Sequence, residues 1–115
     1  MLTYNLNKKT FVTLGNPDGL ASSETLFHYF QKGSEIFGNY SGGEILKGQL
    51  VGKALSLNRI QMLFQCLTST EELLSGRSIG MVDQNEDGLI RLSFNWNLFT
   101  GDISGGISSY IELPS

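Results

Sequence analysis

Residues 90 to 98 read Ile-Arg-Leu-Ser-Phe-Asn-Trp-Asn-Leu, and this stretch decides the fold class. Apolar side chains occupy every second position, and polar side chains occupy the positions between them. Successive side chains of a β-strand point to opposite faces of the sheet, so the alternation places five apolar residues on one face and four polar residues on the other. The stretch therefore predicts a half-buried β-strand.

Turn signals separate this strand from similar segments along the whole chain. Asp-Gly and Gly-Gly pairs supply the positive φ angles that tight hairpins need. Evenly spaced turns favour an antiparallel meander, because a βαβ layout needs long crossover connections. Seven signals divide the chain into eight segments of strand length, and they lie at 17–19, 32–33, 41–43, 56–58, 68–72, 86–88 and 100–102.

We therefore expect one all-β domain over residues 1–115, an eight-stranded antiparallel up-and-down meander. Curling into a small barrel of the calycin or lipocalin type would remove the exposed sheet edges. Eight strands leave an interior just wide enough for side chains or for one small ligand.

Two segments also fit a helix. Residues 20–31 could form one that ends before Gly33, and Ile60, Leu63, Phe64 and Leu67 follow a helical spacing with Asn58 as an N-cap. We prefer strands for both segments because the hairpin turns continue on either side of them. In the first segment both faces carry apolar groups, as in a strand that is buried on both sides or lines a cavity.

Composition limits the classes of function. The chain has 115 residues, of which 40% are hydrophobic and 17% are charged, and its net charge is −3. Lysine and arginine form no run, so we expect no nucleic-acid partner. The single cysteine, Cys66, excludes an internal disulfide and a thiolate metal cage. The first residues lack the apolar region typical of a signal peptide and no apolar stretch has the length of a membrane helix, so we expect a cytoplasmic protein.

The segment Asp83-Gln84-Asn85-Glu86-Asp87-Gly88 matches the start of an EF-hand calcium loop. That loop also needs a bidentate carboxylate at its twelfth position, where this chain has Phe94. It needs flanking helices too, whereas residues 90–98 alternate as a strand. We interpret the segment as a polar hairpin turn, with weak calcium binding as the alternative.

The segment Gln49-Leu50-Val51-Gly52-Lys53-Ala54 fits the Q/R-x-x-G-x-G/A loop of acetyl-CoA-dependent N-acetyltransferases. Such a loop holds a pyrophosphate on backbone N–H groups at a helix N-terminus. Here the helix would have to be the ambiguous segment that follows, at 55–67. We interpret the motif as a strand in which Gly48 and Gly52 permit a bulge or close packing.

Candidate ligand-binding side chains come from the aromatic and polar positions of the predicted strands. His28 lacks a second histidine for a metal site, and on a strand it would share a face with Glu24, as a hydrogen-bonded or acid–base pair. His28 and Tyr29 have opposite parity, so both cannot point inward. We predict no catalytic residue, metal or cofactor, and the candidates are Glu24, His28, Tyr29, Tyr40, Gln65 and Trp96.

Several blocks are similar to a known family. Ser-Ser-Glu-Thr-Leu-Phe-His-Tyr at 22–29 and Tyr-Ser-Gly-Gly-Glu-Ile at 40–45 are the most specific, and the similarity extends from about residue 4 to Glu112. Together they resemble a family of small bacterial proteins commonly labelled N-acetylglutamate synthase. The resemblance implies an acetyl-CoA-dependent enzyme, although relatives carry His-Glu-Lys before the tryptophan and this chain has Phe94 within Ser-Phe-Asn at 93–95.

The sequence thus leads to one main functional hypothesis and two alternatives. The main hypothesis is a non-enzymatic barrel that binds a small, partly apolar molecule in its mouth or lumen. One alternative is the acetyltransferase that the family label implies, which requires a helix at 55–67. The other is a protein-interaction or homo-oligomer-forming module, which would show an exposed apolar patch and a filled lumen.

Overall fold

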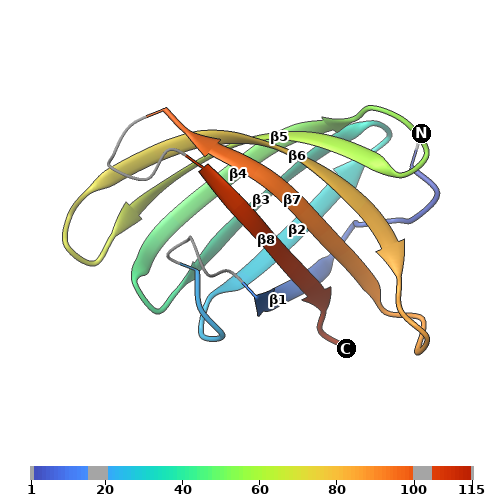
Figure 1. Ribbon diagram of the computed structural model, residues 1–115, viewed down its shortest axis with the longest axis horizontal. Coiled ribbons are helices and arrows are strands. Elements are labelled where there is room, and N and C mark those ends of the chain that lie inside the picture. Colours follow the sequence, from blue (N-terminus) through green and yellow to red (C-terminus); the bar gives the residue numbers. More distant parts are fainter. Residues whose placement is uncertain (1, 16–20, 100–104, 115) are drawn as a thin grey trace.

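The computed structural model describes residues 2–15, 21–99 and 105–114, and these residues form strands and turns without any helix. Figure 1 shows the strands running around a common axis. Their bounds are β1 Lys9–Gly15, β2 Leu26–Lys32, β3 Glu35–Gly42, β4 Ile45–Ala54, β5 Arg59–Thr68, β6 Leu73–Gln84, β7 Ile90–Leu98 and β8 Gly105–Glu112.

Each strand pairs with its neighbours in sequence, and β1 pairs with β8 to close the barrel. All pairs are antiparallel, and Phe11 of β1 lies opposite Phe27 of β2 on one side and Glu112 of β8 on the other. Closure gives every strand two hydrogen-bonded neighbours, so no sheet edge remains. The expected eight-stranded antiparallel meander and its barrel closure are confirmed.

The two ends of the barrel differ. One end holds the described connections 21–25, 43–44 and 69–72, and we call it the mouth. The opposite end, the base, holds 33–34, 55–58 and 85–89 together with the N-terminal residues 2–8. At the base, Leu2 and Leu6 are buried, and the backbone N–H of Thr3 donates to the carbonyl of Leu57 at 2.7 Å. The N-terminal segment therefore covers this end.

The turns fall where the sequence predicts them, with one difference at the mouth. β3 continues to Gly42, so the turn expected at 41–43 narrows to residues 43–44, with bulges after Tyr40 and Ile45. Gly33, Gly43 and Gly88 have the positive φ angles that the tight turns require. The turns expected at 17–19 and 100–102 lie outside the described residues.

Both ambiguous segments are strands where the structure describes them. Residues 59–68 form β5, which pairs with β4 and β6 along its length, and residues 26–32 form β2. The helical spacing of Ile60, Leu63, Phe64 and Leu67 is therefore coincidental. Ile60 is fully buried, whereas Leu63 is 52% exposed on the opposite face, as period two requires. The described part of the chain contains no helix that could cross a membrane.

Large lumen side chains pack across glycines of neighbouring strands. Gly48 of β4 lies opposite Tyr40 of β3, and a Cβ atom at Gly48 would overlap the tyrosine ring. Gly80 of β6 lies opposite Phe94 of β7 with the same consequence. A barrel of eight strands has little interior volume, so each ring needs a neighbour without a side chain.

We expect Gly48→Ala to lower the free energy of unfolding by about 1–3 kcal/mol, because the added methyl group overpacks the lumen against Tyr40. Urea unfolding followed by circular dichroism measures the change. Asn95→Ala, at an exposed position of β7, is the control and should change stability little. Equal stabilities for Gly48→Ala and the parent protein would contradict this account of the packing.

A candidate ligand-binding site in the barrel lumen

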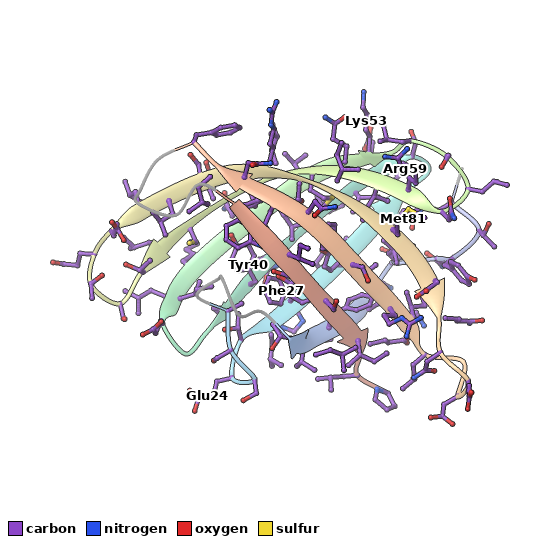
Figure 2. All side chains as sticks on the ribbon, in the orientation of Figure 1. Glu24, Phe27, Tyr40, Lys53, Arg59 and Met81 are labelled. Carbon is purple, nitrogen blue, oxygen red and sulfur yellow. The ribbon has the colours of Figure 1, made fainter. Side chains whose placement is uncertain are left out.

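Aromatic rings line the interior of the barrel between β2, β3, β7 and β8. Phe27 and Tyr40 stack with ring centroids 4.8 Å apart, and Figure 2 shows this pair inside the ring of strands. Tyr110 meets Phe27 edge-on at 4.9 Å and Phe94 at 5.8 Å. These four rings and Trp96 occupy inward-facing positions of their strands, and aromatic rings are surfaces on which small apolar molecules stack.

Polar groups among these rings form short hydrogen bonds. The Trp96 indole N–H donates to Ser108 Oγ at 2.7 Å, and the Tyr40 hydroxyl donates to the carbonyl of Gln65 at 3.1 Å. Burial raises the pKa of Tyr40 and of Tyr110 above the ordinary tyrosine value, so both phenols stay neutral. The lumen thus combines aromatic surface with uncharged hydrogen-bonding groups.

Two buried hydroxyl groups have no hydrogen-bond partner among the described residues. Tyr29 is 4% exposed and Ser78 is 7% exposed, and both side chains point into the barrel. In the same residues, no fully enclosed side-chain oxygen or nitrogen lacks a partner. The Tyr29 and Ser78 hydroxyls must therefore touch space that a water-sized molecule can enter. They are groups that a ligand or an internal water molecule could satisfy.

The six residues predicted from sequence fall into three places. Tyr29, Tyr40 and Trp96 are buried and face the lumen. His28 and Gln65 lie on the outer face of β2 and β5, so the barrel brings only three of the six together inside. Glu24 is exposed in the mouth, where Figure 2 labels it.

The proposed pairing of Glu24 with His28 does not form. β2 begins at Leu26, so Glu24 lies in the preceding turn and does not share a strand face with His28. His28 instead pairs across the strands, with Nδ1 3.1 Å from the Thr10 hydroxyl. Its role on the outer face is a structural hydrogen bond between β1 and β2.

Sequence reasoning missed several lumen residues, which are Phe27, Ser78, Phe94, Ser108 and Tyr110. Alternation alone places Phe94 beside Trp96 and Phe27 beside Tyr29, because each pair is two residues apart. Ser108 and Tyr110 share a parity, but the segment 105–112 has no continuous apolar alternation to show which face is buried. Only pairing with β1 and β7 turns that face inward.

The segment Asp83–Gly88 forms a hairpin turn, as the sequence predicts. The Asn85 side-chain carbonyl accepts from the backbone N–H groups of Asp87 at 3.0 Å and Leu89 at 2.9 Å. Arg91 donates to both carboxylate oxygens of Asp83, at 2.9 and 2.8 Å. The first calcium-ligand position is thus committed to an ion pair, and the described residues contain no group of three or more His, Cys, Asp or Glu side chains that could hold a metal ion.

The segment Gln49–Ala54 lies within β4 and precedes a turn and strand β5 instead of a helix. A Cβ atom at Gly52 would overlap the carbonyl of Gln61 and the sulfur of Met62. Gly52 therefore permits close strand packing, as the strand interpretation expects. The helix N-terminus that a pyrophosphate-binding loop needs does not exist at residues 55–67.

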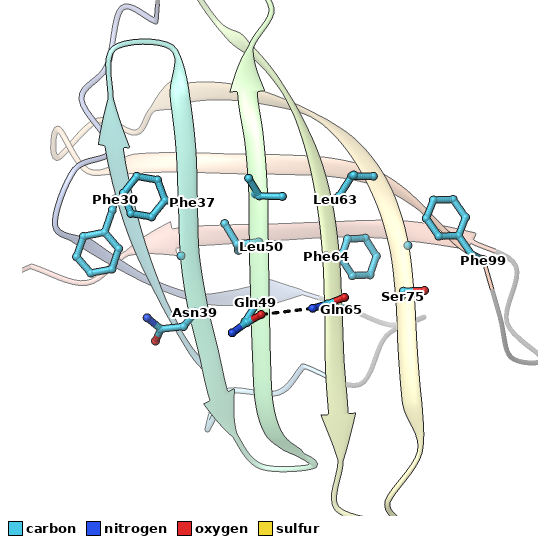
Figure 3. A pocket seen from close by; sticks show the side chains of 13 residues that line it. Phe30, Phe37, Asn39, Gln49, Leu50, Leu63, Phe64, Gln65, Ser75 and Phe99 are labelled. Atoms are coloured by element: carbon cyan, nitrogen blue, oxygen red, sulfur yellow. Dashed lines mark hydrogen bonds between the residues drawn. The ribbon is translucent and has the colours of Figure 1, made fainter.

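A second concave surface lies on the outside of the barrel, across β2 to β6. Figure 3 shows Phe30, Phe37 and Phe99 bordering it and Gln65 bonded to Gln49, with Nε2 donating to Oε1 at 3.3 Å. Its volume is about 590 Å³. Its apolar border, with Phe37 44% and Leu63 52% exposed, resembles a contact surface more than an enclosed ligand site.

The Asp83–Arg91 pair predicts a pH dependence of stability. Hydrogen bonding from Arg91 lowers the pKa of Asp83 in the folded protein below its unfolded value of about 4. The pair therefore stabilises the folded state fully above pH of about 4. This contribution is lost as the pH falls through the lower pKa that Asp83 has in the folded protein. The difference in unfolding free energy between the parent and Asp83→Asn should be small at pH 7, because the pair is exposed, and should vanish in acid. Asp87→Asn, which removes an exposed carboxylate of the same hairpin, is the control. A difference between the parent and Asp83→Asn that grows in acid would contradict the predicted pH dependence.

Ser108→Ala should destabilise the protein by about 1–3 kcal/mol, because the buried Trp96 N–H loses its acceptor. In a Trp96→Phe background, which has no indole N–H, the same substitution should cost clearly less. Thermal or urea unfolding of the four proteins measures the coupling. Equal costs in both backgrounds would show that the hydrogen bond contributes nothing to stability.

Comparison with known proteins agrees with this architecture. No curated protein and no solved structure matches the chain at a significant level. A family model described as "Avidin-like protein" matches residues 4–113, which is nearly the whole chain and includes all eight strands. The protein therefore belongs to the avidin-like protein family.

Proposed function

We propose that this protein is a non-enzymatic binding protein that holds one small, partly apolar molecule in the lumen of its barrel. The observation that carries the proposal is the pair of buried hydroxyls, Tyr29 and Ser78, which face the lumen without a partner among the described residues. Because these two hydroxyls touch space that a water-sized molecule can enter, a ligand in the lumen can supply their hydrogen bonds in place of water.

The surrounding rings supply the apolar part of the proposed site. Phe27, Tyr40 and Tyr110 pack at stacking and edge-on distances, and rings of this kind favour a flat apolar partner. The size of the barrel also fits, because eight-stranded barrels such as streptavidin hold a single small ligand. Membership of the avidin-like family supports the same reading.

The two alternatives have unequal support. An acetyl-CoA-dependent enzyme would need a helix after the Gln49–Ala54 segment, and the structure has a turn and strand β5 there. An interaction module draws on the exposed outer residues Phe37, Val51 and Leu63, which lie side by side on β3, β4 and β5. This outer face and the lumen are separate surfaces, so an oligomer is compatible with lumen binding.

Binding can be tested with small aromatic probes that carry one hydrogen-bonding group: benzyl alcohol, benzamide and benzylamine. Trp96 is the only tryptophan, so its fluorescence should change on binding. Cys66 lies next to Tyr40, and burial raises the pKa of its thiol. A probe bound beside Tyr40 should cover the thiol further and slow its reaction with a thiol reagent. Failure of all three probes to alter either signal would overturn the proposal.

Tyr29→Phe separates binding from folding. Removing the unpartnered hydroxyl should leave the stability of the free protein unchanged or higher, while weakening the best probe by roughly 2–10-fold, the worth of about one hydrogen bond. Tyr4→Phe, which alters a tyrosine packed against the core in the N-terminal segment, is the control and should leave probe affinity unchanged. A loss of stability with unchanged probe affinity would show that the Tyr29 hydroxyl is structural.

A further inference from the structure

Glutamates occupy every described connection at the mouth. Glu24 lies before β2, Glu44 lies between β3 and β4, and Glu71 and Glu72 lie between β5 and β6. All four are exposed, and none has an ion-pair partner among the described residues. The Ser69 N–H donates to the Glu44 carbonyl at 2.8 Å, and the Thr25 hydroxyl donates to the Gly42 carbonyl at 3.0 Å, so the turns that carry these glutamates adjoin one another at one end of the barrel.

Positive side chains are absent from these turns. Residues 21–25, 43–44 and 69–72 contain neither lysine nor arginine. Lys47, the nearest cation in sequence, is exposed on the outer face of β4, while Lys53 and Arg59 lie toward the base, far from Glu24 in Figure 2. Among the described residues, the only charged side chains of the mouth turns are therefore negative. A negative opening raises the local concentration of cations and their rate of entry.

One of the mouth glutamates acts on a side chain of β5 that lies beside the aromatic rings. Burial raises the pKa of the Cys66 thiol, and the charge of Glu72 raises it further, so the carboxylate acts on a group beside Tyr40. Inside, the faces of Tyr40, Phe27 and Trp96 carry the partial negative charge that attracts organic cations. The buried Tyr29 hydroxyl, which has no partner among the described residues, offers an oxygen that an ammonium N–H can donate to.

We propose that the lumen ligand is a protonated amine attached to a small apolar body, attracted by the glutamates of the mouth and held by the aromatic faces and the Tyr29 hydroxyl. This inference rests on the proposed function and narrows its ligand class. A carboxylate or phosphate ligand would have to pass four unpaired carboxylates, and no cation in the described mouth turns would receive it.

Three probes of nearly equal shape test the charge: benzylamine, which is cationic at pH 7, benzyl alcohol, which is neutral, and benzoate, which is anionic. Titration followed by Trp96 fluorescence gives each affinity. We expect benzylamine to bind roughly tenfold more tightly than benzyl alcohol, and benzoate to bind most weakly. The preference for benzylamine should shrink as the ionic strength rises from about 0.01 M to about 0.1 M, because the screening length falls from ~30 Å to ~10 Å.

A matched pair of variants locates the effect. Glu24→Gln with Glu72→Gln removes two charges from the mouth, and Glu35→Gln with Glu86→Gln removes two exposed charges from the base. The mouth variant should lose roughly threefold or more of its benzylamine affinity and keep its benzyl alcohol affinity, whereas the base variant should keep both. A preference for benzylamine that survives the mouth substitutions and added salt would overturn the role of the glutamates.

The outcomes separate this inference from the proposed function. Binding of benzyl alcohol or benzoate as tightly as benzylamine would overturn the amine ligand while leaving lumen binding intact. Absence of binding by all three would overturn lumen binding, and the amine ligand with it. A fall in benzylamine affinity in Tyr29→Phe, without a fall in stability, would support the hydroxyl as its hydrogen-bond acceptor.

Discussion

Pairing between the first and last strands is the constraint on which the rest of the structure depends. Phe11, Val12 and Thr13 of β1 lie opposite residues 110–112 of β8, and this ladder turns an eight-stranded sheet into a tube. Without it, two long edges would be free to pair with other chains. With it, every strand has one face turned into a narrow interior, and that interior is where function can reside.

The narrow interior explains the glycines. Tyr40 and Phe94 each lie across a glycine of a neighbouring strand, so the rings occupy volume that a second side chain would otherwise take. Glycines that lie within or beside the acetyltransferase-like motif in the sequence thus serve packing. Gly48 and Gly52 belong to the closely packed interior of β4, and only Gly88 in the Asp83 segment serves a turn.

The polar groups of this lumen fall into two sets. The Trp96–Ser108 and Tyr40–Gln65 hydrogen bonds satisfy most of its polar groups, while Tyr29 and Ser78 keep hydroxyls without a partner among the described residues. Hydroxyls that touch accessible space can be satisfied by internal water or by a bound molecule. The two ends of the barrel also differ: the acidic turns lie at the mouth, and the N-terminal segment covers the base.

The sequence by itself determined the strand count, the turns within the described residues and the inner face of β7, because period two and turn chemistry are local properties. It also identified Tyr40 and Trp96 as site candidates. It did not place His28 and Gln65 outside, separate Glu24 from β2, or reveal Ser108 and Tyr110. Register, bulges and closure decided those, since they depend on pairing between distant strands that no local pattern records.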